Sequence, residues 1–61
     1  MSRKTIHRPG ELVLTSGQYG VVNSYGTYMH REVTCVRGEK FPPVHRSRGE
    51  YGFVLRDATR H

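Results

Sequence analysis

The chain has 61 residues, of which 34% are hydrophobic, and a domain of this length buries only roughly 60% of the surface that its unfolded chain exposes. It is therefore one domain at most. A single cysteine excludes an internal disulfide, and no apolar stretch approaches the roughly 18 residues of a membrane span. The net charge of +5, carried mainly by eight arginines, favours polyanionic partners, unless the arginines only reflect a GC-rich genome.

The N-terminal segment, residues 1–8, is polar and cationic, and we predict a flexible basic arm. Residues 9–61 are predicted to form the single small β domain. The arm lacks the apolar region of a secretory signal. Together with the lone cysteine, this composition predicts a cytoplasmic location.

Short strands are predicted along the first half of the chain. The turn signal Pro9-Gly10 precedes a short candidate strand at 11–14, and 18–23 follows as a second, with apolar residues in alternation. A glycine-containing hairpin turn is predicted at 24–26. The clearest strand is 28–36, with Val33 and Cys35 on one face and Glu32, Thr34 and Val36 on the other.

The second half begins with a turn at Arg37-Gly38 and reaches Pro42-Pro43, which supplies no ladder donors and ends any strand pairing. Residues 44–49 are predicted as a polar loop. Residues 50–56 are predicted as the last strand, because apolar side chains recur there at period two. With seven glycines and three prolines, the chain has no window that favours a helix.

The predicted fold class is therefore all-β. It is a small antiparallel sheet, or an SH3-like partly closed barrel, of three to four short strands in a meander. The small core is expected to rest on four aromatic residues, Tyr19, Phe41, Tyr51 and Phe53, with valines around them.

Several short motifs resemble a family of small uncharacterised bacterial proteins, the YjzC-like proteins. They are Arg8-Pro9-Gly10, Ser16-Gly17-x-Tyr19, Arg31-Glu32-Val33-Thr34 and Gly38-Glu39-x-Phe41-Pro42-Pro43. The resemblance covers roughly residues 8–55 and implies a compact bacterial domain, without implying catalytic residues. In some similar sequences a Cys-x-x-Cys follows Phe-Pro-Pro. Val44 and Ser47 stand there in this chain, so a zinc site of relatives is not intact here.

Metal and cofactor sites are not expected. Structural zinc sites show paired ligands at close spacing, and His30 and Cys35 are five residues apart and on opposite faces of a predicted strand. Cys35 lies among strand residues with no helix N-terminus to activate a thiolate, so we predict a small, buried, inert core residue. No phosphate-binding loop is present.

The function expected from the sequence is a non-enzymatic binding or accessory domain, with no catalytic residues. One alternative is association with single-stranded nucleic acid or ribosomes, because aromatic residues alternate with arginines and stacking on a basic sheet holds single strands. A second alternative is a weak structural homodimer formed through edge strands. The candidate nucleic-acid residues are Tyr25, Tyr28, Arg31, Arg37, Arg46 and Arg48.

Overall fold

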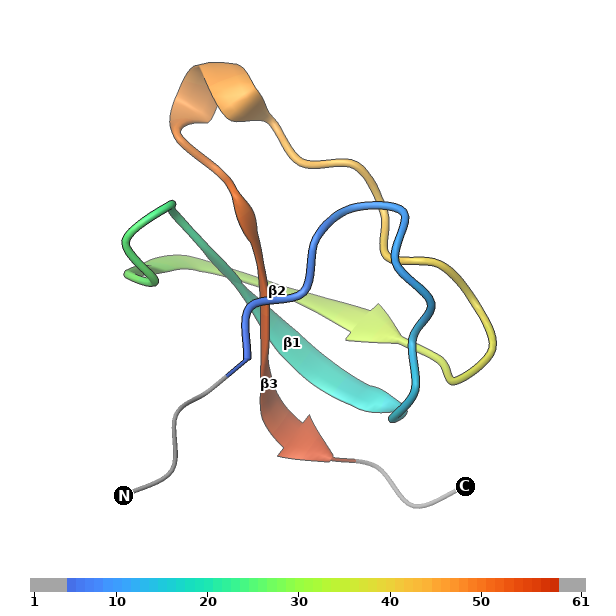
Figure 1. Ribbon diagram of the computed structural model, residues 1–61. Helices are drawn as coiled ribbons and strands as arrows, with labels where there is room; N and C mark the ends of the chain where they lie inside the picture. Colours follow the sequence, from blue (N-terminus) through green and yellow to red (C-terminus); the bar gives the residue numbers. More distant parts are fainter. Residues whose placement is uncertain (1–4, 59–61) are drawn as a thin grey trace.

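The computed structural model describes residues 5–58, and its architecture is an open, three-stranded antiparallel sheet (Figure 1). The strands are β1 (Gly17–Val22), β2 (Tyr28–Cys35) and β3 (Gly52–Ala58). The one helical element among the described residues is a single 3-10 turn, η1 (Arg46–Arg48). The predicted all-β class is confirmed, in the form of the open sheet.

The predicted meander is wrong in its strand order. The order is β2-β1-β3, so the last strand pairs with β1 and not with its predecessor β2. Residues 36–51 carry the chain away from β2 through Pro42-Pro43 and η1, and return it on the other side of β1 (Figure 1). A connection of this length lets the chain bypass the nearest edge, which a tight hairpin turn would not allow.

The central strand β1 pairs with both edge strands and sets their register. Tyr19 lies opposite Val33 of β2 and Leu55 of β3, and Val21 lies opposite Phe53. Because cross-strand partners share a face, these side chains form the apolar side of the sheet. The predicted alternation in β2 is confirmed, with Cys35 buried while Glu32 and Thr34 are exposed.

The core lies on this apolar side and is built around a stack of aromatic rings. Phe41 stacks on Phe53 with ring centroids 5.3 Å apart and meets the edge of Tyr19 at 4.9 Å. All three rings are buried, as predicted. Tyr51, the fourth predicted core ring, is only half-buried and lies outside the core cluster, with the Arg8 guanidinium over its face at 3.8 Å from the ring centroid. The face of the Tyr51 ring thus contacts a cation in place of the apolar side chains that its period-two pattern predicted.

Residues 11–14 do not form a strand of the sheet, contrary to the prediction. They pair with residues 38–41 in a short antiparallel contact, with a bridge between Leu12 and Lys40. Val13 donates its amide hydrogen to the Glu39 carbonyl at 2.7 Å. This pair of segments crosses the apolar side of the sheet, where Val13 and Phe41 close the core. The two prolines after Phe41 end the pairing, because they offer no amide hydrogens.

Of the predicted arm, residues 1–8, the structure describes residues 5–8, where His7 pairs with the sheet; residues 1–4 lie outside the described residues. His7 and Phe53 exchange two backbone hydrogen bonds, of 2.7 and 2.8 Å, and the His7 ring stacks on Phe41. A Cβ on Gly52 would lie 2.5 Å from the His7 carbonyl oxygen, so this close approach requires glycine. Backbone pairing of this kind leaves no hydrophobic pattern in the sequence.

No helix in the described part of the chain is long and apolar enough to cross a membrane.

The thiol of Cys35 is buried in the core, as predicted, with 4% of its surface exposed. Burial, and to a lesser degree the negative charge of Glu39, raises its pKa. We therefore expect slow reaction with a thiol reagent under native conditions and fast reaction in denaturant. Cys35→Ser should destabilise the fold by about 1–3 kcal/mol, because a hydroxyl is costly to desolvate. Rapid labelling of the native protein, followed by absorbance, would contradict this prediction.

Candidate functional site

The candidate site is a pocket of about 360 Å³ on the side of the sheet that faces away from the core. Val22 and Gly20 of β1 and Val54 of β3 line it from the sheet. Ile6 and the hairpin between β1 and β2 complete its walls. The volume lies at the small end of ligand pockets, which commonly measure roughly 300–1,000 Å³.

Gly20 makes room for the two largest groups of this pocket. A Cβ at this position would lie 2.7 Å from Cδ of Arg56 and 3.1 Å from the Tyr28 ring. Because glycine has no side chain, Arg56 from β3 and Tyr28 from β2 both reach over the central strand. Side chains of the two edge strands therefore lie close together above β1 at this point.

Tyr28, Arg56 and Glu32 form one cluster beside the pocket. The Arg56 guanidinium lies over the Tyr28 ring, 4.2 Å from its centroid. Nε of Arg56 is 3.0 Å from Oε2 of Glu32, and the Tyr28 hydroxyl lies 3.5 Å from the same oxygen. The ion pair and the ring hold the guanidinium in place, although both charged side chains stay more than 40% exposed. A positioned arginine, a carboxylate and an aromatic ring are thus available to a ligand.

Four of the six predicted site residues lie at the hairpin end of the sheet. Tyr25 is at the hairpin tip, 91% exposed, and lines the pocket with Tyr28. The side chain of Asn23 accepts hydrogen bonds from the amides of residues 25 and 27 and so supports the tip. Arg46 and Arg48 are exposed in η1, and no ion pair among residues 5–58 engages them.

The 3-10 turn itself is close to the start of β2. A Cβ on Gly49, the residue that caps η1, would lie 3.9 Å from Cε of Met29. Figure 1 shows η1 and the hairpin at the same end of the molecule. Arg46 and Arg48 therefore belong to the same end as the tyrosines.

Arg31 does not join this group, because it is committed to the core side of the sheet. Its Nη1 donates to both carboxylate oxygens of Glu50, at 2.8 and 2.9 Å. The amide of His45 donates to the same carboxylate at 2.9 Å. These bonds lower the pKa of Glu50, the His45 amide first and Arg31 second, against the opposing effect of burial. Arg31 is a structural partner for a buried anion, and its predicted part in nucleic-acid binding stays a prediction.

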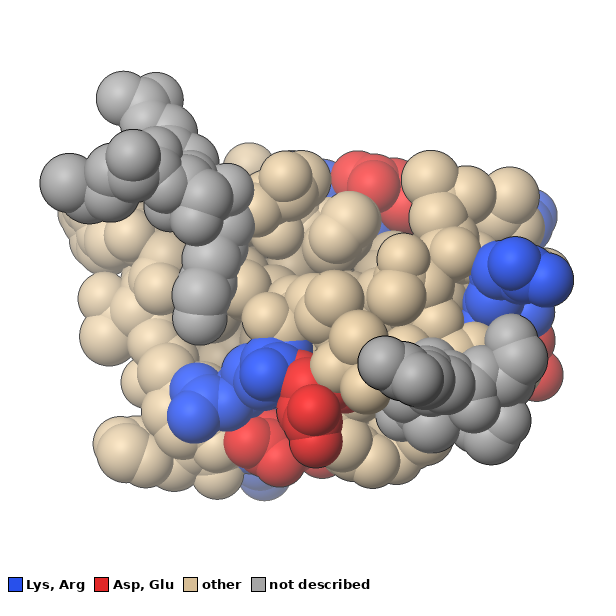
Figure 2. All heavy atoms as spheres, turned by 90° about the horizontal axis from the view of Figure 1, so that it is seen from below, with Lys and Arg blue, Asp and Glu red and all other residues tan. Residues whose placement is uncertain are grey.

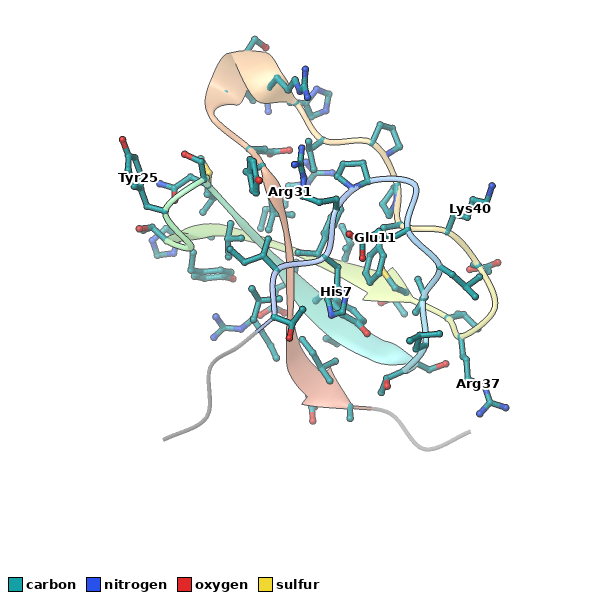
Figure 3. All side chains as sticks on the ribbon, in the orientation of Figure 1. His7, Glu11, Tyr25, Arg31, Arg37 and Lys40 are labelled. Carbon is teal, nitrogen blue, oxygen red and sulfur yellow. The ribbon has the colours of Figure 1, made fainter. Side chains whose placement is uncertain are left out.

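Arg37 also lies apart from the tyrosines. It follows the end of β2, whereas the hairpin precedes the start of that strand, and Figure 3 shows Tyr25 and Arg37 on opposite sides of the molecule. The backbone amide of Arg37 donates to the Ser16 hydroxyl at 2.8 Å. The six predicted residues therefore do not share one surface.

Seven residues of the site and its rim were not predicted as site residues from the sequence: Ile6, Gly20, Val22, Gly26, Glu32, Val54 and Arg56. Strand alternation placed Glu32 on the face away from the core, and this was the one available signal. The others come together through the pairing of β3 with β1 and the return of the N-terminal segment. Neither feature is marked by a motif.

Charge is distributed in small groups over one face of the molecule (Figure 2). On the face that Figure 2 shows, the basic atoms form separate groups with acidic atoms beside them and uncharged surface between. Within residues 5–58, no group of three or more His, Cys, Asp or Glu side chains is arranged to hold a metal ion. A candidate interface for polyanions on this protein would thus depend on a few positioned basic side chains and not on a continuous basic surface.

In comparisons with protein-family models, curated proteins and solved structures, no match is found for this chain. The resemblance to YjzC-like proteins stays a prediction.

Proposed function

We propose that this chain is a small non-enzymatic binding domain that holds single-stranded nucleic acid at the hairpin end of its sheet. The observation that carries the proposal is an aromatic pocket at the same end of the sheet as two exposed arginines, which no ion pair among residues 5–58 engages. A bacterial origin, implied by the resemblance stated above, and a cytoplasmic location, predicted from the composition, belong to the same proposal.

The aromatic part of the site supports base stacking. Tyr25 presents nearly its whole ring to solvent, and Tyr28 lies next to it with a guanidinium on its face. Stacking of bases on aromatic side chains contributes about 1–3 kcal/mol per base and tolerates any sequence. An exposed tyrosine at a hairpin tip has no packing role in this fold, which makes stacking the better explanation.

The basic part of the site supports phosphate contacts. Arg46 and Arg48 are exposed in η1, at the same end of the molecule as the hairpin, and the chain as a whole carries a net charge of +5. Arginine binds phosphate through a planar fork of donors. A strand that stacks on the tyrosines would bring its backbone near these arginines.

The two contributions separate in a salt titration. We expect Arg46→Ala combined with Arg48→Ala to weaken binding and to flatten the plot of log affinity against log salt concentration. The slope should change by about 1.4, since each phosphate contact of a single strand contributes about 0.7. Tyr25→Ala should weaken binding about 10-fold and leave the slope unchanged, because stacking releases few counterions. Fluorescence anisotropy of a labelled oligonucleotide measures both quantities.

Arg37→Ala is the matched control, because it removes an exposed arginine from the far end of β2. It should change neither the slope nor the effect of Tyr25→Ala. Equal losses from Arg37→Ala and from the η1 arginines would mean diffuse charge attraction. The absence of any binding at 50 mM salt would refute the proposed function.

The alternative of an edge-strand homodimer has less structural support. β2 carries two extra residues opposite Val21, where His30 has a positive φ of 59°, and this irregularity interrupts the outer edge. The outer edge of β3 is bridged by His7 at Phe53. Bulges and covering segments are the usual means by which sheets prevent edge pairing.

A further inference from the structure

The hydrogen-bonding groups beside the pocket lead to an inference about the ligand that rests on the proposed function. We infer that the pocket accepts one base of the bound strand and that Arg56 and Glu32 together select guanine. After the two side chains pair with each other, each keeps hydrogen-bonding groups that a base can use.

Arg56 lines the pocket, and its ion pair with Glu32 leaves its two terminal nitrogens unused. Its ion pair with Glu32 uses Nε, and no hydrogen bond or ion pair within residues 5–58 engages its two terminal nitrogens. The Tyr28 ring fixes the plane of the guanidinium. An arginine fork held in this way matches two adjacent acceptors, and guanine presents such a pair in O6 and N7.

Glu32 has a free acceptor next to those donors. Its Oε2 contacts both Nε of Arg56 and the Tyr28 hydroxyl, while Oε1 has no partner among the described side chains. The N1–H and N2–H₂ donors of guanine follow directly after O6 along the edge of the base. Arg56 can therefore donate to N7 and O6 of guanine while Glu32 beside it accepts from the N1–H and N2–H₂ groups.

Other bases do not match this order of groups. Uracil lacks an amino donor, cytosine lacks the N7 acceptor, and adenine has an amino donor where guanine has O6. The apolar pocket walls, Val22, Val54 and Ile6, contact only the faces and edges of a ring and do not discriminate. Selectivity would come from Arg56 and Glu32 alone.

The test compares labelled uridine nine-mers that differ only in the central base. We expect the strand with guanine to bind about 10-fold more tightly than those with adenine, cytosine or uracil, the discrimination typical of a bidentate pair. A strand with inosine at the centre, which lacks the N2 amino group, should bind the unaltered protein more weakly than the guanine strand. Amide shifts of Gly20 and Val54 in ¹⁵N spectra should follow the guanine strand.

Glu32→Gln should remove the guanine preference, so that the four strands bind with equal affinity. Glu39→Gln is the control, because it makes the same change of charge on an exposed turn outside the pocket. Arg56→Lys, which keeps the charge but loses the fork, is a second variant that should also remove the preference.

The outcomes are distinguishable. Equal affinity for all four bases would overturn the inference and leave the proposed function intact. A guanine preference that survives Glu32→Gln and Arg56→Lys would overturn the roles of these two residues. If no strand binds, the proposed function fails and the inference fails with it.

Discussion

Phe41→Ala is expected to lower the free energy of unfolding by about 4 kcal/mol, within the range for deleting a buried phenyl ring. Phe41 is 3% exposed and lies between the rings of His7 and Phe53, with Tyr19 at its edge. Its removal would leave a cavity between the sheet and the segments that cover it. A domain of this length has a total stability of only about 3–9 kcal/mol, so the variant should be largely unfolded at 37 °C.

Urea unfolding followed by circular dichroism measures this effect. Phe41→Leu is the matched variant and should cost about 1.5 kcal/mol, since it keeps most of the apolar volume. Leu14→Ala removes a side chain that is 71% exposed and should change stability by less than about 0.5 kcal/mol. A small loss for Phe41→Ala would show that the covering segments are not part of the cooperative core.

Arg31→Met is expected to cost about 3 kcal/mol, at the low end of the range for breaking a buried ion pair because Arg31 itself is partly exposed. The variant leaves the Glu50 carboxylate, whose side chain is 5% exposed, with only the amide of His45 as a partner. Arg46→Met is the matched control, because Arg46 is exposed and in no ion pair of the described residues. Equal effects of the two substitutions would contradict the structural role of Arg31.

The same pair predicts a dependence of stability on pH. Because the folded state lowers the pKa of Glu50, the ionised carboxylate stabilises the fold above its unfolded pKa of about 4.3. This contribution is lost as the pH falls through the lower folded value. Denaturation midpoints between pH 7 and pH 3 should therefore fall for the unaltered protein. They should fall less for Glu50→Gln, which has no carboxylate to protonate.

Single-sequence reasoning predicted the features that depend on local alternation. The period-two pattern of residues 28–36 placed Cys35 and Val33 on the buried face and Glu32 on the exposed one, and the aromatic residues Tyr19 and Phe41 were expected in the core. These predictions hold because a strand projects successive side chains to opposite faces, whatever its partners are.

The tertiary structure decided which segments meet. The pairing of β3 with β1, the return of His7 to Phe53 and the meeting of Arg56 with Tyr28 over Gly20 all join positions far apart in the chain. Arg31 shows the consequence for the candidate site. The alternation of β2 predicts which face of the sheet Arg31 occupies, but it does not predict the buried partner Glu50, 19 residues away. Local periodicity determines the face of a residue, and only the long-range register determines its contacts.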